Sequence, residues 1–141
     1  MTIAKNQVNQ FSTFYINNKL YGVNVMRVQE ITKSLPITRI PLSPAYVHGL
    51  INLRGQISTA VSLRELFKIP GNPPENFMNV VCKFDEVLVS FIVDQIGDVM
   101  EFNSSDSIPV PETIPSEVRS FLAEIYKTPQ NLLSIIDIYK Y

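Results

Sequence analysis

The stretch Gly49–Ile57, with the sequence GLINLRGQI, sets a charged residue among apolar ones. The aliphatic side chains follow the pattern of a buried strand wall: Leu50, Ile51, Leu53 and Ile57. Arg54 stands between them, and its guanidinium does not lose its proton in proteins. Because an unpaired buried charge is costly, Arg54 must either reach solvent or pair with an acidic residue.

Around this stretch the sequence predicts mostly strands. Phe11–Ile16 and Leu20–Val25 are rich in aromatic and β-branched residues and flank a polar turn, which predicts a β-hairpin. Val80–Phe84 and Val87–Val93 predict a second hairpin, with two acidic residues as its connection. Ten prolines and five glycines punctuate the chain, so we expect an all-β protein, either a sandwich or a barrel.

Helical signals are few and short. Ser62–Glu65 (SLRE) is a capping box, which predicts one helix that runs through Phe67 and ends before Pro70. Ser43-Pro44 and Ser116 mark two further brief turns.

An internal repeat divides the chain. Val23–Ile31 (VNVMRVQEI) aligns with Phe91–Val99 (FIVDQIGDV), with the apolar positions in step. Val61–Leu63 likewise aligns with Ile136–Ile138. The repeat predicts two similar small barrels, each too small to be stable alone and packed face to face. The alternative is chance similarity among β-rich segments.

Composition excludes several classes of protein. The chain has 141 residues, 18% of them charged, and a net charge of −1, so it lacks the basic field expected of a nucleic-acid-binding protein. The longest apolar run, Val87–Val93, is too short to cross a bilayer, and the N-terminal residues do not resemble a signal peptide. Cys82 is the only cysteine, which fits a reducing compartment. We therefore expect a soluble cytoplasmic protein.

No catalytic or cofactor-binding pattern stands out. His48 is the only histidine and has no triad-like neighbours, while Cys82 lies in an apolar segment and is expected to be buried and inert. One histidine and one cysteine are too few for an ordinary zinc site, and the glycine-rich nucleotide-binding loops are absent. We expect no enzymatic activity, no metal and no cofactor.

Several short motifs occur along the chain in a recognisable order, namely Tyr21–Val23, Val28–Ile31, Thr38–Pro41, Val47–Ile57, Val61–Arg64, Ile92–Asp94 and Asp98-Val99. Together they resemble the CheW family of chemotaxis adaptors. The similarity runs from about Phe11 to Tyr139, and the specific part is the Gly-Leu-Ile-Asn-Leu-Arg-Gly run.

The chain also departs from the family pattern. Ser62 stands where the family usually has Asp, although serine can also cap a helix. Pro129 and Gln130 fall where a second copy of Arg54 and Gly55 would stand, so only the first half carries the charged feature.

The resemblance implies a single CheW-like domain over residues 1–141. This domain would contain two five-stranded barrels similar to Src-homology-three domains, packed around a shared apolar core. The expected subdomains are intertwined and span about residues 11–70 and about 77–141, with a possible strand crossover.

The resemblance also implies a function without catalysis. Family members are scaffolds that couple the cytoplasmic tips of chemoreceptors to the histidine kinase CheA, through its regulatory domain, at receptor arrays on the inner face of the membrane. No nucleic acid and no direct membrane insertion are expected. The alternatives are an adaptor of the same fold in pilus motility or gene regulation, and a β-barrel that binds a small ligand.

The same resemblance implies two surfaces. The receptor tip would dock in a groove between the barrels, lined by Val28, Glu30, Ile31 and Val99. For the three aliphatic residues the alternative is core packing. The surface that couples to kinase and receptor would contain Gly49, Asn52, Arg54 and Gly55.

These motifs offer an answer for Arg54. Glu30 lies in another motif of the same half of the chain, and we predict that Glu30 and Arg54 pair within the first barrel. The alternative is that Arg54 extends to water while its aliphatic stem covers apolar surface.

Overall fold

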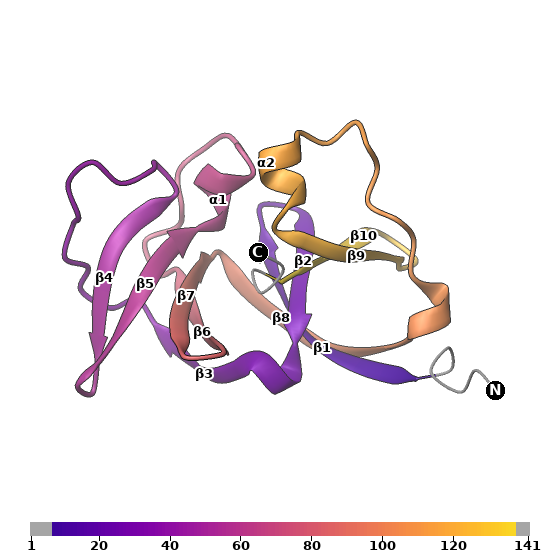
Figure 1. Cartoon of the computed structure of the whole chain (residues 1–141), viewed down its shortest axis with the longest axis horizontal. Coiled ribbons are helices and arrows are strands. Elements are labelled where there is room, and N and C mark those ends of the chain that lie inside the picture. The colour runs from indigo at the N-terminus through magenta and orange to yellow at the C-terminus, as the bar shows by residue number, and fades with distance from the viewer. Residues whose placement is uncertain (1–6, 138–141) are drawn as a thin grey trace. The chain divides into compact units, whose positions relative to one another are not determined.

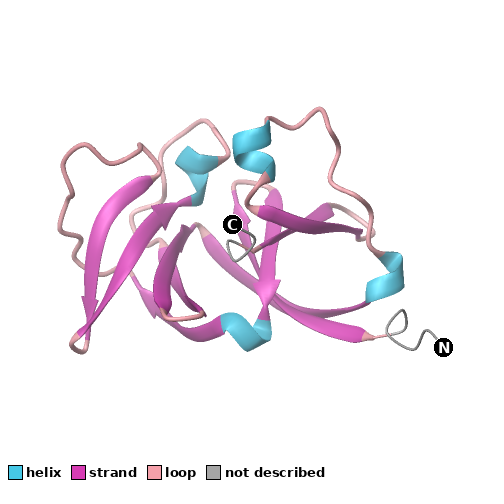
Figure 2. Ribbon diagram, in the orientation of Figure 1, coloured by secondary structure: helices cyan, strands magenta, loops and turns pink. Residues whose placement is uncertain are grey.

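The computed structural model describes residues 7–137 and consists mostly of strands (Figure 1). The strands are β1 (Val8–Ile16), β2 (Lys19–Asn24), β3 (Val28–Lys33), β4 (Val47–Leu53), β5 (Gln56–Ser62), β6 (Met78–Phe84), β7 (Val87–Val93), β8 (Gln95–Asn103), β9 (Leu122–Lys127) and β10 (Leu132–Ile136). Short helices interrupt them (Figure 2), namely the 3-10 turns η2 (Val25–Arg27) and η3 (Ser104–Asp106) and the one-turn helices α1 (Leu63–Leu66) and α2 (Ser116–Arg119).

The strands form two five-stranded sheets, which confirms the predicted all-β fold. One sheet has the order β8-β1-β2-β10-β9 and the other the order β3-β6-β7-β5-β4. Each contains one parallel pair, β10 with β2 and β5 with β7. The aligned segments Val23–Ile31 and Phe91–Val99 lie at equivalent places in the two orders, since each leaves a strand of the parallel pair and enters an edge strand. This correspondence favours a true repeat over chance similarity.

The chain forms two compact units. Unit 1 contains the chain up to Val25 and from Gly97 onward, and unit 2 is the continuous segment Met26–Ile96. The chain passes from unit 1 to unit 2 within the repeated segment Val23–Ile31, and returns to unit 1 within the repeated segment Phe91–Val99. The strands are therefore divided differently from the predicted ranges 11–70 and 77–141, because β1 and β2 pair with β8 and β10 in unit 1.

The core of unit 1 is aromatic. Tyr126 is buried, and its ring centroid lies 4.7 Å from that of Phe102 in a stacked pair and 5.5 Å from that of Phe11. Leu20 and Leu133, on the β2–β10 parallel pair, complete the same cluster. The pairing of β2 with β10 thus brings Leu20 and Leu133, which are more than 100 positions apart in the sequence, into one core.

The core of unit 2 contains only part of the predicted buried wall. Ile51 and Leu53 of β4 are buried, but Ile57 is 55% exposed and Leu50 is half-buried. Arg54 does not lie inside a strand, because the chain turns there between β4 and β5. The prediction of one continuous buried wall was therefore wrong, and the turn is its physical reason.

Helix α1 begins at the predicted cap. The Oγ atom of Ser62 accepts a hydrogen bond from the N–H of Glu65 at 3.2 Å, and the helix ends with Phe67 as its C-cap. The N–H of Ser62 donates a hydrogen bond to the carbonyl of Tyr46. In a complete capping box this N–H would instead donate to the side chain of Glu65. The bond to Tyr46 ties the start of α1 to the segment that precedes β4.

Candidate functional site

The turn between β4 and β5 has an unusual backbone. Arg54 and Gly55 both have positive φ angles, 52° and 89°, as in a type I′ hairpin turn. The side chain of Asn52 supports this turn, because its Oδ1 atom accepts a hydrogen bond from the N–H of Gly55 at 2.9 Å. Three of the four predicted coupling residues therefore form one exposed hairpin tip.

The hairpin tip carries an ion pair. The Nη2 atom of Arg54 donates to Oε1 of Glu30, so the two residues paired in the sequence analysis meet in unit 2. The Arg54 side chain is 71% exposed and the Glu30 side chain 23% exposed. The sequence analysis posed two alternatives, that Arg54 reaches solvent or that it pairs with an acidic residue. The structure shows both, because the paired side chain is also exposed.

This pair links the two edges of the unit 2 sheet. Glu30 lies on β3, one edge strand, and Arg54 directly follows β4, the other edge strand. The Nε2 atom of Gln29 also donates to Oε1 of Gln56 at 3.4 Å, from β3 to the start of β5. A register shift between Val28 and Glu30 interrupts the regular pairing of β3 with β6 here. Charge and amide contacts therefore hold the hairpin tip against β3.

The aliphatic residues of the predicted receptor groove are accessible to different degrees. Ile31 is 40% exposed and Val99 59% exposed, while Val28 is half-buried. Val28 and Ile31 lie on β3 in unit 2, and Val99 lies on β8 in unit 1. Core packing, the alternative for these residues, is thus excluded for Ile31 and Val99.

Gly49 does not belong to an exposed surface. It is buried, has a φ of 144°, and its Cα approaches the carbonyl of Thr38 so closely that a Cβ would clash with it. The backbone of Thr38 exchanges two 2.8 Å hydrogen bonds with Leu50 at this point. The prediction that Gly49 contributes to the coupling surface is therefore corrected, since the residue is required by backbone packing.

A second ion pair was missed by the sequence analysis. The Nη2 atom of Arg64 lies 2.6 Å from Oδ2 of Asp94, and both side chains are largely buried. Arg64 also donates through Nη1 to the carbonyl of Pro70 at 2.8 Å. Arg64 and Asp94 each stand at the end of a motif that carries the resemblance, which was the only available signal. Residue spacing alone does not bring them together.

Cys82 is buried on β6, as expected. Burial raises the pKa of its thiol to about 12, against a smaller opposing effect of Arg27. A thiol with such a pKa is not a nucleophile at neutral pH. Among the side chains described, which within residues 7–137 are all but those of 117 and 118, no three His, Cys, Asp or Glu gather as a metal-ion site. No helix in this part of the chain is long and apolar enough to span a membrane.

Two five-stranded sheets, one of them with an exposed, charge-paired hairpin tip, define a β-rich protein built from two similar halves. Residues 10–141 match the CheW-like domain, so the chain belongs to the CheW-like family.

Comparison with known proteins supports this assignment over nearly the whole chain. The chain is 30% identical over 132 residues to "Chemotaxis protein CheW" of Klebsiella aerogenes, covering 93% of this chain and 80% of the relative. It is also 30% identical over 125 residues to the protein of that name in Bacillus subtilis, covering 88% and 80%. The crystal structure of the scaffolding protein TtCheW from Thermoanaerobacter tengcongensis superposes with a TM-score of 0.82, at 26% identity, covering 94% of this chain and 86% of that one.

Proposed function

We propose that this protein is an adaptor in bacterial chemotaxis that couples the cytoplasmic tips of chemoreceptors to the histidine kinase CheA. The observation that carries the proposal is the CheW-like domain match over residues 10–141. The relatives are named chemotaxis proteins and a scaffolding protein, which supports the same proposal. In this role the protein acts at receptor arrays on the cytoplasmic face of the membrane.

The proposed adaptor catalyses no reaction of its own. Its contribution is to hold two partners in a productive arrangement, which requires surfaces rather than a nucleophile or a cofactor. The inert environment of Cys82 is compatible with that role.

Two sets of residues are proposed to make the contacts. Val28 and Ile31 in unit 2, and separately Val99 in unit 1, supply aliphatic area for a receptor helix, in the manner of a helix docking on an apolar surface. Asn52, Arg54 and Gly55 form the surface that couples to the kinase or receptor, and Glu30 holds Arg54 in place. The exposure of Ile31, Val99 and Arg54 supports this division, because a partner can contact side chains that face solvent.

Reconstitution tests the proposal. Purified protein is added to membranes that contain a chemoreceptor and CheA from the same genome, and kinase autophosphorylation is followed with labelled ATP. We expect kinase activity to rise with added protein, and to rise less with Ile31→Ser. Lys83→Ser, an exposed substitution on β6, is the matched control. No rise in kinase activity with unaltered protein, together with no binding to either partner, would reject the adaptor function.

A further inference from the structure

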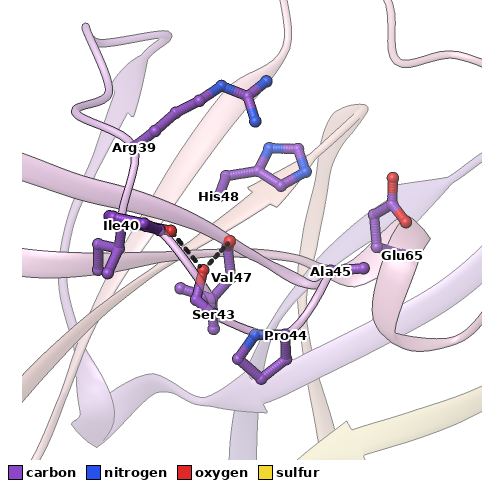
Figure 3. A pocket seen from close by; sticks show the side chains of 9 residues that line it. Arg39, Ile40, Ser43, Pro44, Ala45, Val47, His48 and Glu65 are labelled. Carbon is purple, nitrogen blue, oxygen red and sulfur yellow. Dashed lines mark hydrogen bonds between the residues drawn. The ribbon is translucent and has the colours of Figure 1, made fainter.

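Unit 2 has a hollow that none of the surfaces above includes. It has a volume of about 740 Å³ and lies between the segment that precedes β4, the start of β4 and helix α1 (Figure 3). This volume falls within the usual range of about 300–1,000 Å³ for binding pockets. The hollow shares no residue with the proposed receptor and coupling surfaces.

Hydrogen bonds and prolines restrict the wall of the hollow. The Oγ atom of Ser43 lies 2.9 Å from the carbonyl oxygen of Ile40 and 3.4 Å from that of Val47, and it donates within this loop (Figure 3). The N–H of Val47 donates to the carbonyl of Pro44 at 2.9 Å. Two prolines, Pro41 and Pro44, restrict the same loop further. A ligand would thus meet a preformed surface and lose little free energy in ordering it.

Charged and polar side chains line the hollow together with apolar ones. Arg39 and His48 lie on one side of Figure 3 and Glu65 on the other. His48 is the extra residue of a register shift in β4, between Val47 and Gly49, and such a bulge redirects a side chain. The hollow therefore offers two hydrogen-bond donors that suit an anion, and one carboxylate that suits a donor.

Arg39 differs from the other arginines of unit 2. Arg54 pairs with Glu30, Arg64 pairs with Asp94, and Arg27 lies over the ring of Phe84 at 5.3 Å. Among the described residues, the guanidinium of Arg39 has no such partner. A planar guanidinium at the edge of a hollow is suited to a carboxylate.

We propose that this hollow binds an acidic side chain of a partner polypeptide, with Arg39 and His48 on the carboxylate and the prolines against its apolar neighbours. A polypeptide is favoured over a free small molecule because the hollow is open to solvent and would leave much of a small ligand uncovered. Glu65 then faces a backbone N–H or another donor of the same segment. The proposal does not depend on the adaptor function.

An NMR titration of the full chain tests the site. The probe is a capped hexapeptide with one Glu between valine and proline residues, and the reference is the same peptide with Gln in place of Glu. We expect amide shifts at Ala45, Val47 and His48 with the Glu peptide only. Arg39→Gln should raise the Kd about two- to fivefold, the range of an exposed ion pair, and Lys83→Gln should leave it unchanged.

Three outcomes overturn the proposal. Equal binding of the Glu and Gln peptides would remove the carboxylate from the interaction. An unchanged Kd in a well-folded Arg39→Gln variant would remove Arg39. Equal shifts at equal concentration of sodium acetate would show that free carboxylates suffice and that the peptide flanks contribute nothing.

Discussion

Arg54 adopts a backbone conformation that a residue with a side chain seldom takes. The left-handed region costs roughly 1–2 kcal/mol for such a residue, and an exposed ion pair returns less than about 1 kcal/mol. The Arg54 side chain is 71% exposed, so its ion pair does not offset the cost of its backbone conformation, and the residue adds little to the stability of the protein. A residue that breaks a local rule without a compensating gain in stability is expected where function requires it.

Substitution of Arg54 should separate stability from coupling. Asparagine tolerates positive φ, so Arg54→Asn should leave the free energy of unfolding within about 1 kcal/mol of the original. The same variant should lose most receptor-dependent kinase activation. Arg54→Lys keeps a charge for Glu30 but lacks the planar fork, so partial activation is expected.

A double-mutant cycle with Glu30→Gln and Arg54→Asn, measured by urea unfolding, should give a coupling energy below about 1 kcal/mol. A coupling energy of several kcal/mol would show that the pair is buried in solution. Full activation by a folded Arg54→Asn would remove Arg54 from the coupling surface.

The pair of Arg64 and Asp94 should behave differently, because both side chains are largely buried. Asp94→Asn removes the carboxylate charge from this largely buried guanidinium, and we expect a loss of about 3–5 kcal/mol in the free energy of unfolding. Arg64→Met combined with Asp94→Leu should lose less than the sum of the single changes. Lys83→Met is the exposed control, and an equal loss in that variant would contradict the assignment.

Stability should fall at alkaline pH. Burial raises the pKa of Cys82 from 9.0 and that of Tyr21 from 10.0, each to about 12. The unfolded chain therefore loses these protons at lower pH than the folded chain. The stability that the protonated groups contribute is complete below about pH 8.5 and declines as the pH rises toward 12. Urea midpoints between pH 7 and 11 should show this decline, and Cys82→Ala should make it shallower.

At the scale of the elements, two glycines of the β4–β5 hairpin make a matched pair. A methyl group at Gly49 would clash with the backbone of Thr38, whereas at Gly55 it would meet nothing within 4 Å. Both have positive φ. We expect Gly49→Ala to cost roughly 2–4 kcal/mol and Gly55→Ala roughly 1–2 kcal/mol. Thermal unfolding of both variants measures the difference, and equal losses would show that the contact with Thr38 is easily relieved.

The sequence predicted those elements whose signals are local. The hairpins Phe11–Ile16 with Leu20–Val25 and Val80–Phe84 with Val87–Val93 appear as β1–β2 and β6–β7, since strand propensity and turn residues act over a few positions. The turn at Arg54 was missed because Arg-Gly is not among the strong turn signals. The resulting strand then wrongly included Ile57, which is exposed.

Contacts that depend on topology could not be predicted in the same way. Arg64 and Asp94 meet because the strands that precede them, β5 and β7, pair up to Ser62 and Ile92. The burial of Gly49 depends on the approach of Thr38, which no periodicity records. For Glu30 and Arg54, the motifs that carry the family resemblance indicated a pair, whereas their exposure required the structure.

At the scale of the whole molecule, the crossing of the chain between units determines which fragments fold. A cut between residues 70 and 77 removes strands from both sheets, so residues 1–70 and 77–141 should each be poorly folded. Residues 26–96 retain all of β3–β7. We expect this fragment to show dispersed amide resonances with marginal stability, as is usual for about seventy residues. A dispersed spectrum from residues 1–70 would contradict this account.

The parallel pairing of β2 with β10 also determines the order in which the two units can fold during synthesis on the ribosome. The β1–β2 hairpin is synthesised first, yet its neighbour β10 ends only at Ile136. At roughly 5–20 residues per second, the hairpin waits on the order of 5–20 s for that strand. Throughout this interval Phe11 and Leu20, which are buried in the finished protein, lack the side chains of Tyr126, Leu133 and Ile135 that complete their cluster. All of unit 2 has been synthesised well before then. The β1–β2 hairpin is therefore the first to be made, yet it belongs to the unit whose strands are completed last.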